Sequence, residues 1–248
     1  MVKYFELLLK NPHKFFRLIR EHVNPRGKLQ PIKRPEFHWR FSMNLAQWII
    51  RHQKEILTTQ VTWMGIPVWK NVLDLFIYQE IIFKQKPDFI VEIGSAEGGS
   101  TLYLAQLCDL LNHGEVLSVD LDHRQFKVDH PRIIKITGQS TDPKVIQKVH
   151  VIAQGKNTLI IQDADHSKEV VLADLNNYSD LVPVRGYFIV EDTIMDVFNP
   201  GNGVGRSIDG PLCAVEQFLR ENKNFVVDES LERYIITQNP HGYLKRMR

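Results

Sequence analysis

Acidic residues follow two apolar segments in the second half of the chain, where they could hold a cation. In "IIQDADHSK", Asp165 comes just after an apolar run, and in "FIVEDT" Glu191 and Asp192 end another run 26 residues later. If these runs are neighbouring strands, the three carboxylates converge, and close anions repel each other unless a cation lies among them. Mg²⁺ prefers such all-oxygen ligands. The pattern predicts a Mg²⁺ site, although these carboxylates and Asp163 could instead be solvated or cap helices.

Two basic residues beside Asp165 are candidates for removing a proton from a substrate. His166 has three interpretations, as a metal ligand, a proton carrier or a packing residue. Lys168 is either the base or an ordinary lysine on the surface of a helix. Because His and Lys side chains near a bound hydroxyl can accept its proton, we treat both as candidate catalytic residues.

A second group of polar residues surrounds the glycine-rich stretch "FIVEIGSAEGGSTLYLAQL" at residues 89–107. Its glycines let the backbone approach a ligand closely, and the helix that follows presents free N–H groups. The spacing G-x-x-x-G-G differs from the dinucleotide-binding pattern G-x-G-x-x-G. Glu92, just before the first glycine, would repel a pyrophosphate but attract an ammonium. The stretch therefore predicts a site for S-adenosylmethionine, which carries an ammonium, a carboxylate and a sulfonium and no phosphate.

Polar residues after the next two apolar runs complete the predicted cofactor site. Asp120 ends "VLSVD", 28 residues after Glu92, where an acidic side chain can accept hydrogen bonds from both ribose hydroxyls. In "TGQST", Gln139 and Ser140 are expected to face the adenine. The alternative is that Glu92 and Asp120 only cap helices. The predicted cofactor-binding residues are Glu92, Gly94, Ser95, Gly98, Ser100, Asp120, Gln139, Ser140 and Asp163.

These residues need strands that end at a common edge. The runs "DFIVEIG", "GEVLSVD", "RIIKITG", "NTLIIQD" and "GYFIVED" are apolar almost throughout, as is typical of strands buried on both faces of a parallel sheet. The last runs, "NFVVDES" and "RYIITQN", are expected to pair as an antiparallel hairpin at one edge. We predict an α/β, Rossmann-like fold with a mostly parallel seven-stranded sheet, in which ligands collect at the carboxyl ends of the strands.

Composition and charge bound the class of protein. The chain has 248 residues, of which 43% are hydrophobic and 24% charged, and this excludes disordered and fibrous classes. Charges interrupt its apolar stretches before they reach membrane-spanning length. Cys108 and Cys213 stand alone without metal or disulfide spacing, and the start lacks the pattern of a secretory signal. We therefore expect a cytoplasmic protein.

The charge is unevenly distributed along the chain. Residues 1–60 hold twelve Lys or Arg and four Asp or Glu, which leaves nineteen and twenty-five for the remainder. We predict a basic, aromatic helical extension at 1–60, serving as a cap or a subunit contact, and a separate α/β domain at 61–248. A homo-oligomer is the expected assembly. Nucleic-acid binding and membrane contact are not expected, because no recognition motif accompanies the charge.

From "WMGIPVWKNVLDLFIYQEII" at residues 63–82 to "NPHGYLKR" at 239–246, the chain resembles the cephalosporin hydroxylase family. That family includes the cephalosporin 7-methoxylation protein and rhamnosyl O-methyltransferases of macrolide pathways. The most specific pieces are "GIPVWKN", "VEIGSAEGGS", "DADHS" and "IVEDT". The resemblance implies an S-adenosylmethionine-dependent class I methyltransferase domain with Mg²⁺ held by Asp165, Glu191 and Asp192. A more distant similarity to catechol O-methyltransferase implies a metal aspartate at Asp165 and a catalytic lysine at Lys168.

These observations predict Mg²⁺-dependent transfer of a methyl group to a hydroxyl of a diol-bearing small molecule, such as a glycoside or a polyketide. The alternative is a noncatalytic partner subunit that binds S-adenosylmethionine within a two-protein tailoring enzyme. An iron oxygenase is disfavoured, because the only H-x-E run, at 113–115, lies in a turn far from the expected strand ends. The glycine-rich stretch 193–210 is expected to order over the acceptor as a lid.

Overall fold

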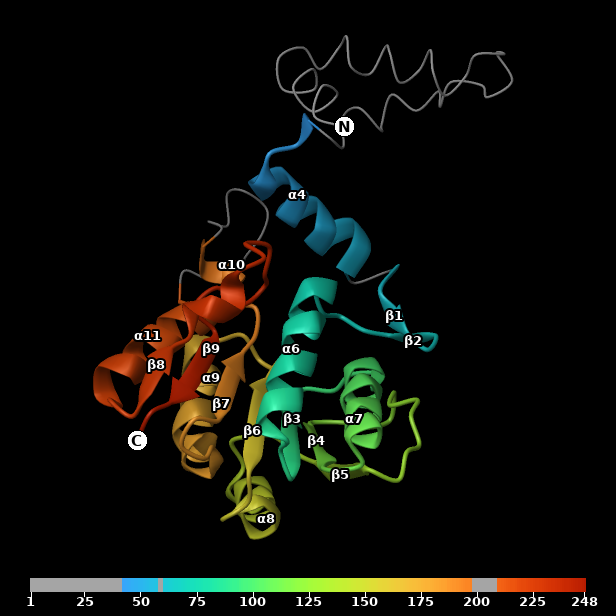
Figure 1. Ribbon diagram of the computed structural model, residues 1–248, viewed down its shortest axis with the longest axis vertical. Coiled ribbons are helices and arrows are strands. Elements are labelled where there is room, and N and C mark those ends of the chain that lie inside the picture. Colours follow the sequence, from blue (N-terminus) through green and yellow to red (C-terminus); the bar gives the residue numbers. More distant parts are fainter. Residues whose placement is uncertain (1–41, 58–59, 198–208) are drawn as a thin grey trace. The chain divides into compact units, whose positions relative to one another are not determined.

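A computed structural model describes residues 42–57, 60–197 and 209–248 of the chain (Figure 1). Most of the predicted extension and residues 198–208 of the predicted lid lie outside the described residues. Residues Leu45–Arg248 form one compact unit, which begins with the helices α4 (Leu45–Arg51) and η1 (His52–Leu57). The division of the chain at residue 60 stays a prediction. Within the described ranges, no helix is long and apolar enough to cross a membrane.

A seven-stranded sheet forms the centre of this unit. In spatial order its strands are β5 (Ile133–Thr137), β4 (Glu115–Asp120), β3 (Phe89–Ile93), β6 (Thr158–Gln162), β7 (Tyr187–Val190), β9 (Tyr243–Arg246) and β8 (Phe225–Val227). The first five are parallel, and β9 runs antiparallel to both of its neighbours. The predicted fold class, a mostly parallel sheet with a C-terminal antiparallel hairpin, is confirmed. The order reverses at β3 and β6, which is where ligands bind in such sheets.

Helices cover both faces of the sheet (Figure 1). One core joins it to α6 (Val72–Gln85) and α7 (Gly99–Leu111), and the other joins it to α8 (Pro143–Ala153), α9 (Lys168–Tyr178) and α11 (Pro211–Glu221). The shorter elements are β1 (Thr62–Trp63), β2 (Ile66–Pro67), η2 (Ser179–Leu181), α10 (Ile194–Val197) and η4 (Glu229–Glu232). Along β3, Ile90 packs toward α6 and Val91 toward the other core. Because successive side chains point to opposite faces, both must be apolar.

The second strand of the C-terminal hairpin differs from the predicted one. The segment "RYIITQN" forms no strand, and within it Ile235 has a φ of 65° and is 73% exposed. The Thr237 hydroxyl and the Gln238 N–H instead donate to the buried Asp74 carboxylate at 2.6 and 2.8 Å. The strand that pairs with β8 is β9, further along the chain. The prediction was wrong here because a buried carboxylate needs donors, and this tertiary demand overrides local β-propensity.

Asp174 is a carboxyl group on α9 that is fully buried beneath the sheet edge. Burial raises its pKa to about 7, although Ser140 and Gln162 beside it act in the opposite direction. Between about pH 4 and pH 7, the Asp174 carboxyl group is therefore protonated in the folded protein. Since this group is not protonated in the unfolded chain, where its pKa has the ordinary value of 3.8, the contribution of Asp174 to stability falls as pH rises through that window.

We expect Asp174→Asn to stabilise the protein, and more so at pH 8 than at pH 5. Asparagine cannot ionise, so the free energy of unfolding of the variant minus that of the original chain should grow by about 2 to 3 kcal/mol between these pH values. Urea unfolding at both pH values measures this difference. Glu216→Gln, at an exposed position on α11, is the control and should show no such growth. A difference for Asp174→Asn that is equal at both pH values would contradict the raised pKa.

Candidate functional site

The carboxyl ends of three adjacent strands carry buried acidic side chains. Ile161 and Ile189 belong to the core on the α6 side, and Asp163 and Glu191 follow each of them by two residues. Alternation along a strand therefore turns both carboxylates to the α6 side. The backbone N–H groups of Asp163 and Glu191 continue the ladder to the neighbouring strand at 2.8 and 2.9 Å. Glu92 in β3 follows Ile90 of the same core by two residues and is fully buried, but in the sheet register it pairs with Ile161, two residues before Asp163.

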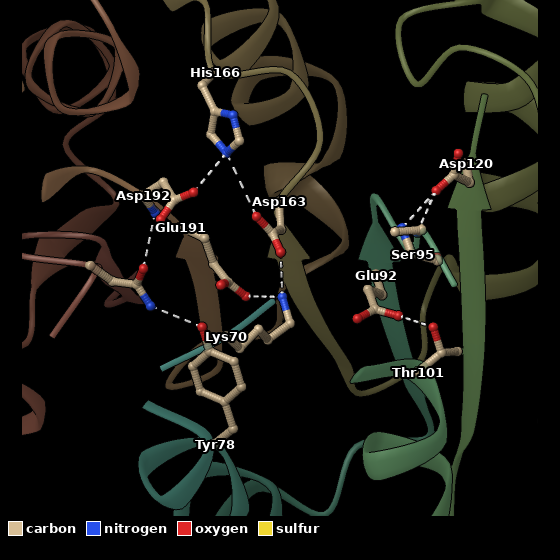
Figure 2. Close-up of polar contacts among 12 residues, drawn as sticks. Lys70, Tyr78, Glu92, Ser95, Thr101, Asp120, Asp163, His166, Glu191 and Asp192 are labelled. Atoms are coloured by element: carbon tan, nitrogen blue, oxygen red, sulfur yellow. Dashed lines mark hydrogen bonds and ion pairs between the residues drawn. The ribbon is translucent and has the colours of Figure 1, made fainter. Parts of the chain in front are cut away.

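Lys70, two residues before α6, lies between these acids (Figure 2). Its Nζ donates to Asp163 Oδ2 at 2.6 Å and to Glu191 Oε1, and the residue is 2% exposed. Burial alone would lower the pKa of Lys70, but Asp163, Glu191 and Glu92 outweigh it and raise the pKa. Lys70 is therefore a charged internal counter-ion for the acids. The same burial, with the Asp163 charge, raises the pKa of Glu191 despite this lysine.

On the other side of Asp163, a second cluster lies at the carboxyl ends of the strands. His166 Nε2 lies 3.1 Å from Asp192 Oδ2 and 3.7 Å from Asp163 Oδ1 (Figure 2). One donor atom of each of these three residues lies within 4.8 Å of the others, which is close enough for a single ion to contact all three. Burial would lower the pKa of His166, but the adjacent carboxylates of Asp163 and Asp192 raise it to about 10.

Asp165 is not part of this cluster, although we predicted it as a metal ligand. It is exposed, and its Oδ1 accepts a hydrogen bond from the Ser167 N–H at 2.7 Å, where the chain turns into α9. The residue that accompanies Glu191 and Asp192 is Asp163, which we had assigned to the cofactor. Asp163 directly continues β6, whereas Asp165 lies beyond it. This side-chain alternation was the signal in the sequence that could have identified Asp163.

A pocket of about 740 Å³ connects the His166 cluster with the glycine-rich loop. The predicted residues that line it are Gly94, Ser95, Ser100, Asp120, Gln139, Ser140, Asp163, Asp165, His166 and Asp192. Trp69 and Lys70, which precede α6, also line it. Four predicted site residues do not line the pocket: Glu92, Gly98, Glu191 and Lys168. Because Lys168 begins α9 outside the pocket, the structure favours its interpretation as a helix-surface lysine.

The glycine-rich loop is fastened by Asp120 at the end of β4. Asp120 Oδ2 accepts hydrogen bonds from the N–H groups of Ser95 and Ala96 at 2.7 and 3.0 Å (Figure 2). Gly94 has a φ of 91°, and a Cβ there would lie 2.0 Å from the Asp163 carbonyl oxygen. Gly94 is therefore required for the close approach of β3 and β6, and Asp120 gives the loop its shape beside the pocket.

Glu92 lies under the loop and turns toward α7. Thr101 Oγ1 donates to Glu92 Oε2, and Oε1 has no hydrogen-bond partner in the described part of the chain (Figure 2). Burial raises the pKa of Glu92, and Lys70 opposes this. Its predicted contact with the ammonium of a cofactor stays a prediction, since the carboxylate does not reach the pocket surface.

Comparisons with known proteins connect this geometry to a family. Residues 55–247 match the family model for Rhamnosyl O-methyltransferase/CmcI. The chain is 30% identical over 200 residues to a rhamnosyl O-methyltransferase of Mycobacterium bovis, covering 77% of this chain and 80% of that protein. A solved structure of CmcI with Mg and SAM has a TM-score of 0.61 and 17% identity and covers 88% of this chain and 87% of its own. The MycE methyltransferase from the mycinamycin biosynthetic pathway, with Mg and SAH, has a TM-score of 0.50 at 17% identity, covering 74% and 51%. The two structural matches share the methyltransferase fold.

Proposed function

The chain belongs to the Rhamnosyl O-methyltransferase/CmcI family, and we propose that it transfers a methyl group from S-adenosylmethionine to a hydroxyl of a diol-bearing small molecule with the aid of Mg²⁺. The observation that carries the proposal is one continuous pocket with two chemically different ends. At one end are Asp120 and the glycine-rich loop, and at the other are His166 and two carboxylates. A methyl donor and a metal-bound acceptor need such an arrangement.

The first end suits S-adenosylmethionine. Asp120 Oδ2 accepts from the Ser95 and Ala96 N–H groups and Oδ1 from the Asp122 N–H at 3.0 Å. Each oxygen of a carboxylate has two lone pairs, so Oδ1 can also accept from a ribose hydroxyl. Gln139 and Ser140 line the neighbouring wall of the pocket and offer polar groups to a base. The CmcI structure with SAM, which has the same fold, supports this assignment.

The second end suits a divalent cation. Asp163 Oδ1 and Asp192 Oδ2 can supply the one or two carboxylates by which Mg²⁺ is usually bound, with water or substrate in its other positions. Glu191 lies nearby but is engaged by Lys70. When bound, S-adenosylmethionine supplies the reactive methyl group, and Mg²⁺ orients the acceptor hydroxyl and lowers its pKa.

Among the pocket residues, His166 is the one suited to take up the proton of the acceptor. Its Nε2 lies 3.1 Å from Asp192 Oδ2 and 3.7 Å from Asp163 Oδ1, beside both carboxylates. These two carboxylates also raise the pKa of His166 to about 10. Without another cation to balance their negative charge, the His166 ring is therefore protonated at neutral pH. His166 becomes a base only when that negative charge is balanced. We therefore assign proton transfer to His166 and not to Lys168.

The acceptor class follows from the remaining walls. Trp69 is 53% exposed and lines the pocket together with Leu57 and Met195, so this region offers apolar surface beside the polar cluster. A ring with an apolar face and adjacent hydroxyls, such as a sugar carried on a larger molecule, fits this combination. The similarity to rhamnosyl O-methyltransferases of Mycobacterium bovis and Mycobacterium leprae supports a glycoside as the acceptor.

The test uses the purified full chain with methyl-labelled S-adenosylmethionine and a panel of rhamnosides and other vicinal diols. We expect label transfer to a diol when Mg²⁺ is present, loss of transfer on chelation with EDTA, and recovery when Mg²⁺ is added back. A matched acceptor lacking one of the two adjacent hydroxyls is the control. Binding of S-adenosylmethionine without transfer to any diol would contradict an enzyme and favour a noncatalytic partner subunit. Transfer that is unaffected by EDTA would contradict the role of the metal.

A further inference from the structure

Asp192 has a backbone conformation that needs support. Its φ is 57°, in the left-handed region that residues other than glycine seldom adopt. At this residue the chain leaves the sheet, because the Glu191 N–H still bonds to the neighbouring strand and the Asp192 N–H does not. The orientation of the Asp192 carboxylate toward His166 depends on this turn. Conformations of this kind persist only where surrounding contacts hold them.

The support comes from Asn239, which lies 47 residues later in the chain. Asn239 Oδ1 accepts a hydrogen bond from the Asp192 N–H at 3.0 Å, and its Nδ2 donates to Tyr78 Oη at 2.9 Å (Figure 2). Tyr78 lies on α6, so one amide connects the backbone of Asp192 to that helix.

Asn239 is itself fixed in place. It is fully buried, and its N–H donates to Thr237 Oγ1 at 2.9 Å. Thr237 Oγ1 in turn donates to Asp74 Oδ1 at 2.6 Å, which ties the segment to α6. A rigid amide of this kind can transmit a fixed orientation to the residues it contacts.

The local fold does not depend on the Asn239 side chain alone. The Ile194 N–H donates to the Gln238 carbonyl at 3.0 Å, and Thr193 Oγ1 donates to the Pro240 carbonyl at 2.6 Å. The Val190 N–H donates to the Gly242 carbonyl at 2.9 Å. Because these contacts use backbone carbonyls, they remain when Asn239 is shortened. The side chain is therefore available for a more specific task than holding the chain together.

We propose that Asn239 is a positioning residue that orients Asp192 for a divalent cation. The proposal rests on the proposed function, since it assumes that this cluster binds Mg²⁺. The carboxylates that bind a metal are commonly oriented by hydrogen bonds from residues behind them, and loss of such a partner costs about 10-fold to 100-fold in metal affinity. In this protein one buried asparagine holds the backbone of Asp192, a candidate ligand.

The experiment measures binding of Mg²⁺ and, separately, of S-adenosylmethionine by calorimetry to the purified full chain. We expect Asn239→Ala to weaken Mg²⁺ binding by about 10-fold to 100-fold and to leave the affinity for S-adenosylmethionine within about twofold, because Asn239 does not line the pocket. Asn157→Ala is the matched control, because it removes comparable side-chain hydrogen bonds near the opposite end of β6. It should lower the unfolding temperature and change neither affinity.

Two results would overturn the proposal. One is unchanged Mg²⁺ affinity in folded Asn239→Ala, and the other is a parallel loss of both affinities, which would indicate a general structural role. If Asn239→Ala does not fold, Asn239→Ser, whose hydroxyl is too short to make both contacts, must show the same selective loss of Mg²⁺ affinity. Failure of the original chain to bind Mg²⁺ would instead contradict the proposed function itself, so the two failures are distinguishable.

Discussion

Asp163→Asn is expected to lower Mg²⁺-dependent methyl transfer by at least about 100-fold, whereas Asp165→Asn should keep it within about threefold. The Asp163 carboxylate lies with His166 and Asp192 in the cluster that can contact one ion. The Asp165 carboxylate is exposed and accepts a hydrogen bond from the N–H of Ser167, the residue just before α9. Asparagine preserves the shape of either side chain and removes only its charge. Initial rates over a Mg²⁺ titration, together with calorimetric Mg²⁺ affinity, measure the difference.

The two variants control each other, because they make the same chemical change two residues apart. S-adenosylmethionine affinity should be similar in both, and unfolding curves should establish that both are folded. A loss with Asp165→Asn that equals or exceeds the loss with Asp163→Asn would reverse the assignment of the ligand. It would mean that Asp165 turns inward when the cation binds.

Lys70→Met is expected to lower the free energy of unfolding by about 3 to 5 kcal/mol. Lys70 is the ammonium that lies between Asp163 and Glu191, with Glu92 also close enough to affect its pKa. Methionine has a similar length and no charge, so the buried carboxylates lose their counter-ion. Removing one partner of a buried ion pair leaves the other charge uncompensated, which is the costly case. Urea unfolding in the absence of divalent cations measures the effect.

Lys84→Met is the matched control, and Lys84 lies near the end of α6, the helix that follows Lys70. Its side chain is 72% exposed and lies 3.9 Å from Glu80, the separation of a weak surface pair. We expect its free energy of unfolding to change by no more than about 0.5 kcal/mol. Equal effects of Lys70→Met and Lys84→Met would show that the buried acids are neutral without Lys70, contrary to its role as a counter-ion.

Much of the fold could be predicted because its strands are buried on both faces. The apolar runs at β3, β4, β5, β6 and β7 each form a parallel strand, as expected from their composition. The C-terminal hairpin is present, but its second strand is Tyr243–Arg246 and not "RYIITQN". That segment supplies donors to Asp74 instead. Local propensity indicated a strand there, and a buried charge far away in the sequence determined the outcome.

The candidate site could be predicted in outline. The expected ends of the strands indicated where acidic and polar residues would gather. In the structure, Asp120, Gln139 and His166 all line one pocket. Asp165 was chosen by its place in a motif and not by the face of the strand, and its role as a metal ligand stays a prediction. Asp163 shares the α6 side of the sheet with Ile161, and this alternation is visible in the sequence.

The order of apolar and polar residues alone determined a parallel α/β sheet with glycines and acids at its carboxyl edge, because burial on two faces leaves few other arrangements. Which acids meet, and what holds them, was decided by the tertiary structure. Lys70 bonds to residues 93 and 121 positions away, and Asn239 to Asp192 across 47. Such contacts depend on packing between distant elements, whereas local patterns report only the face and the end of an element on which a side chain lies.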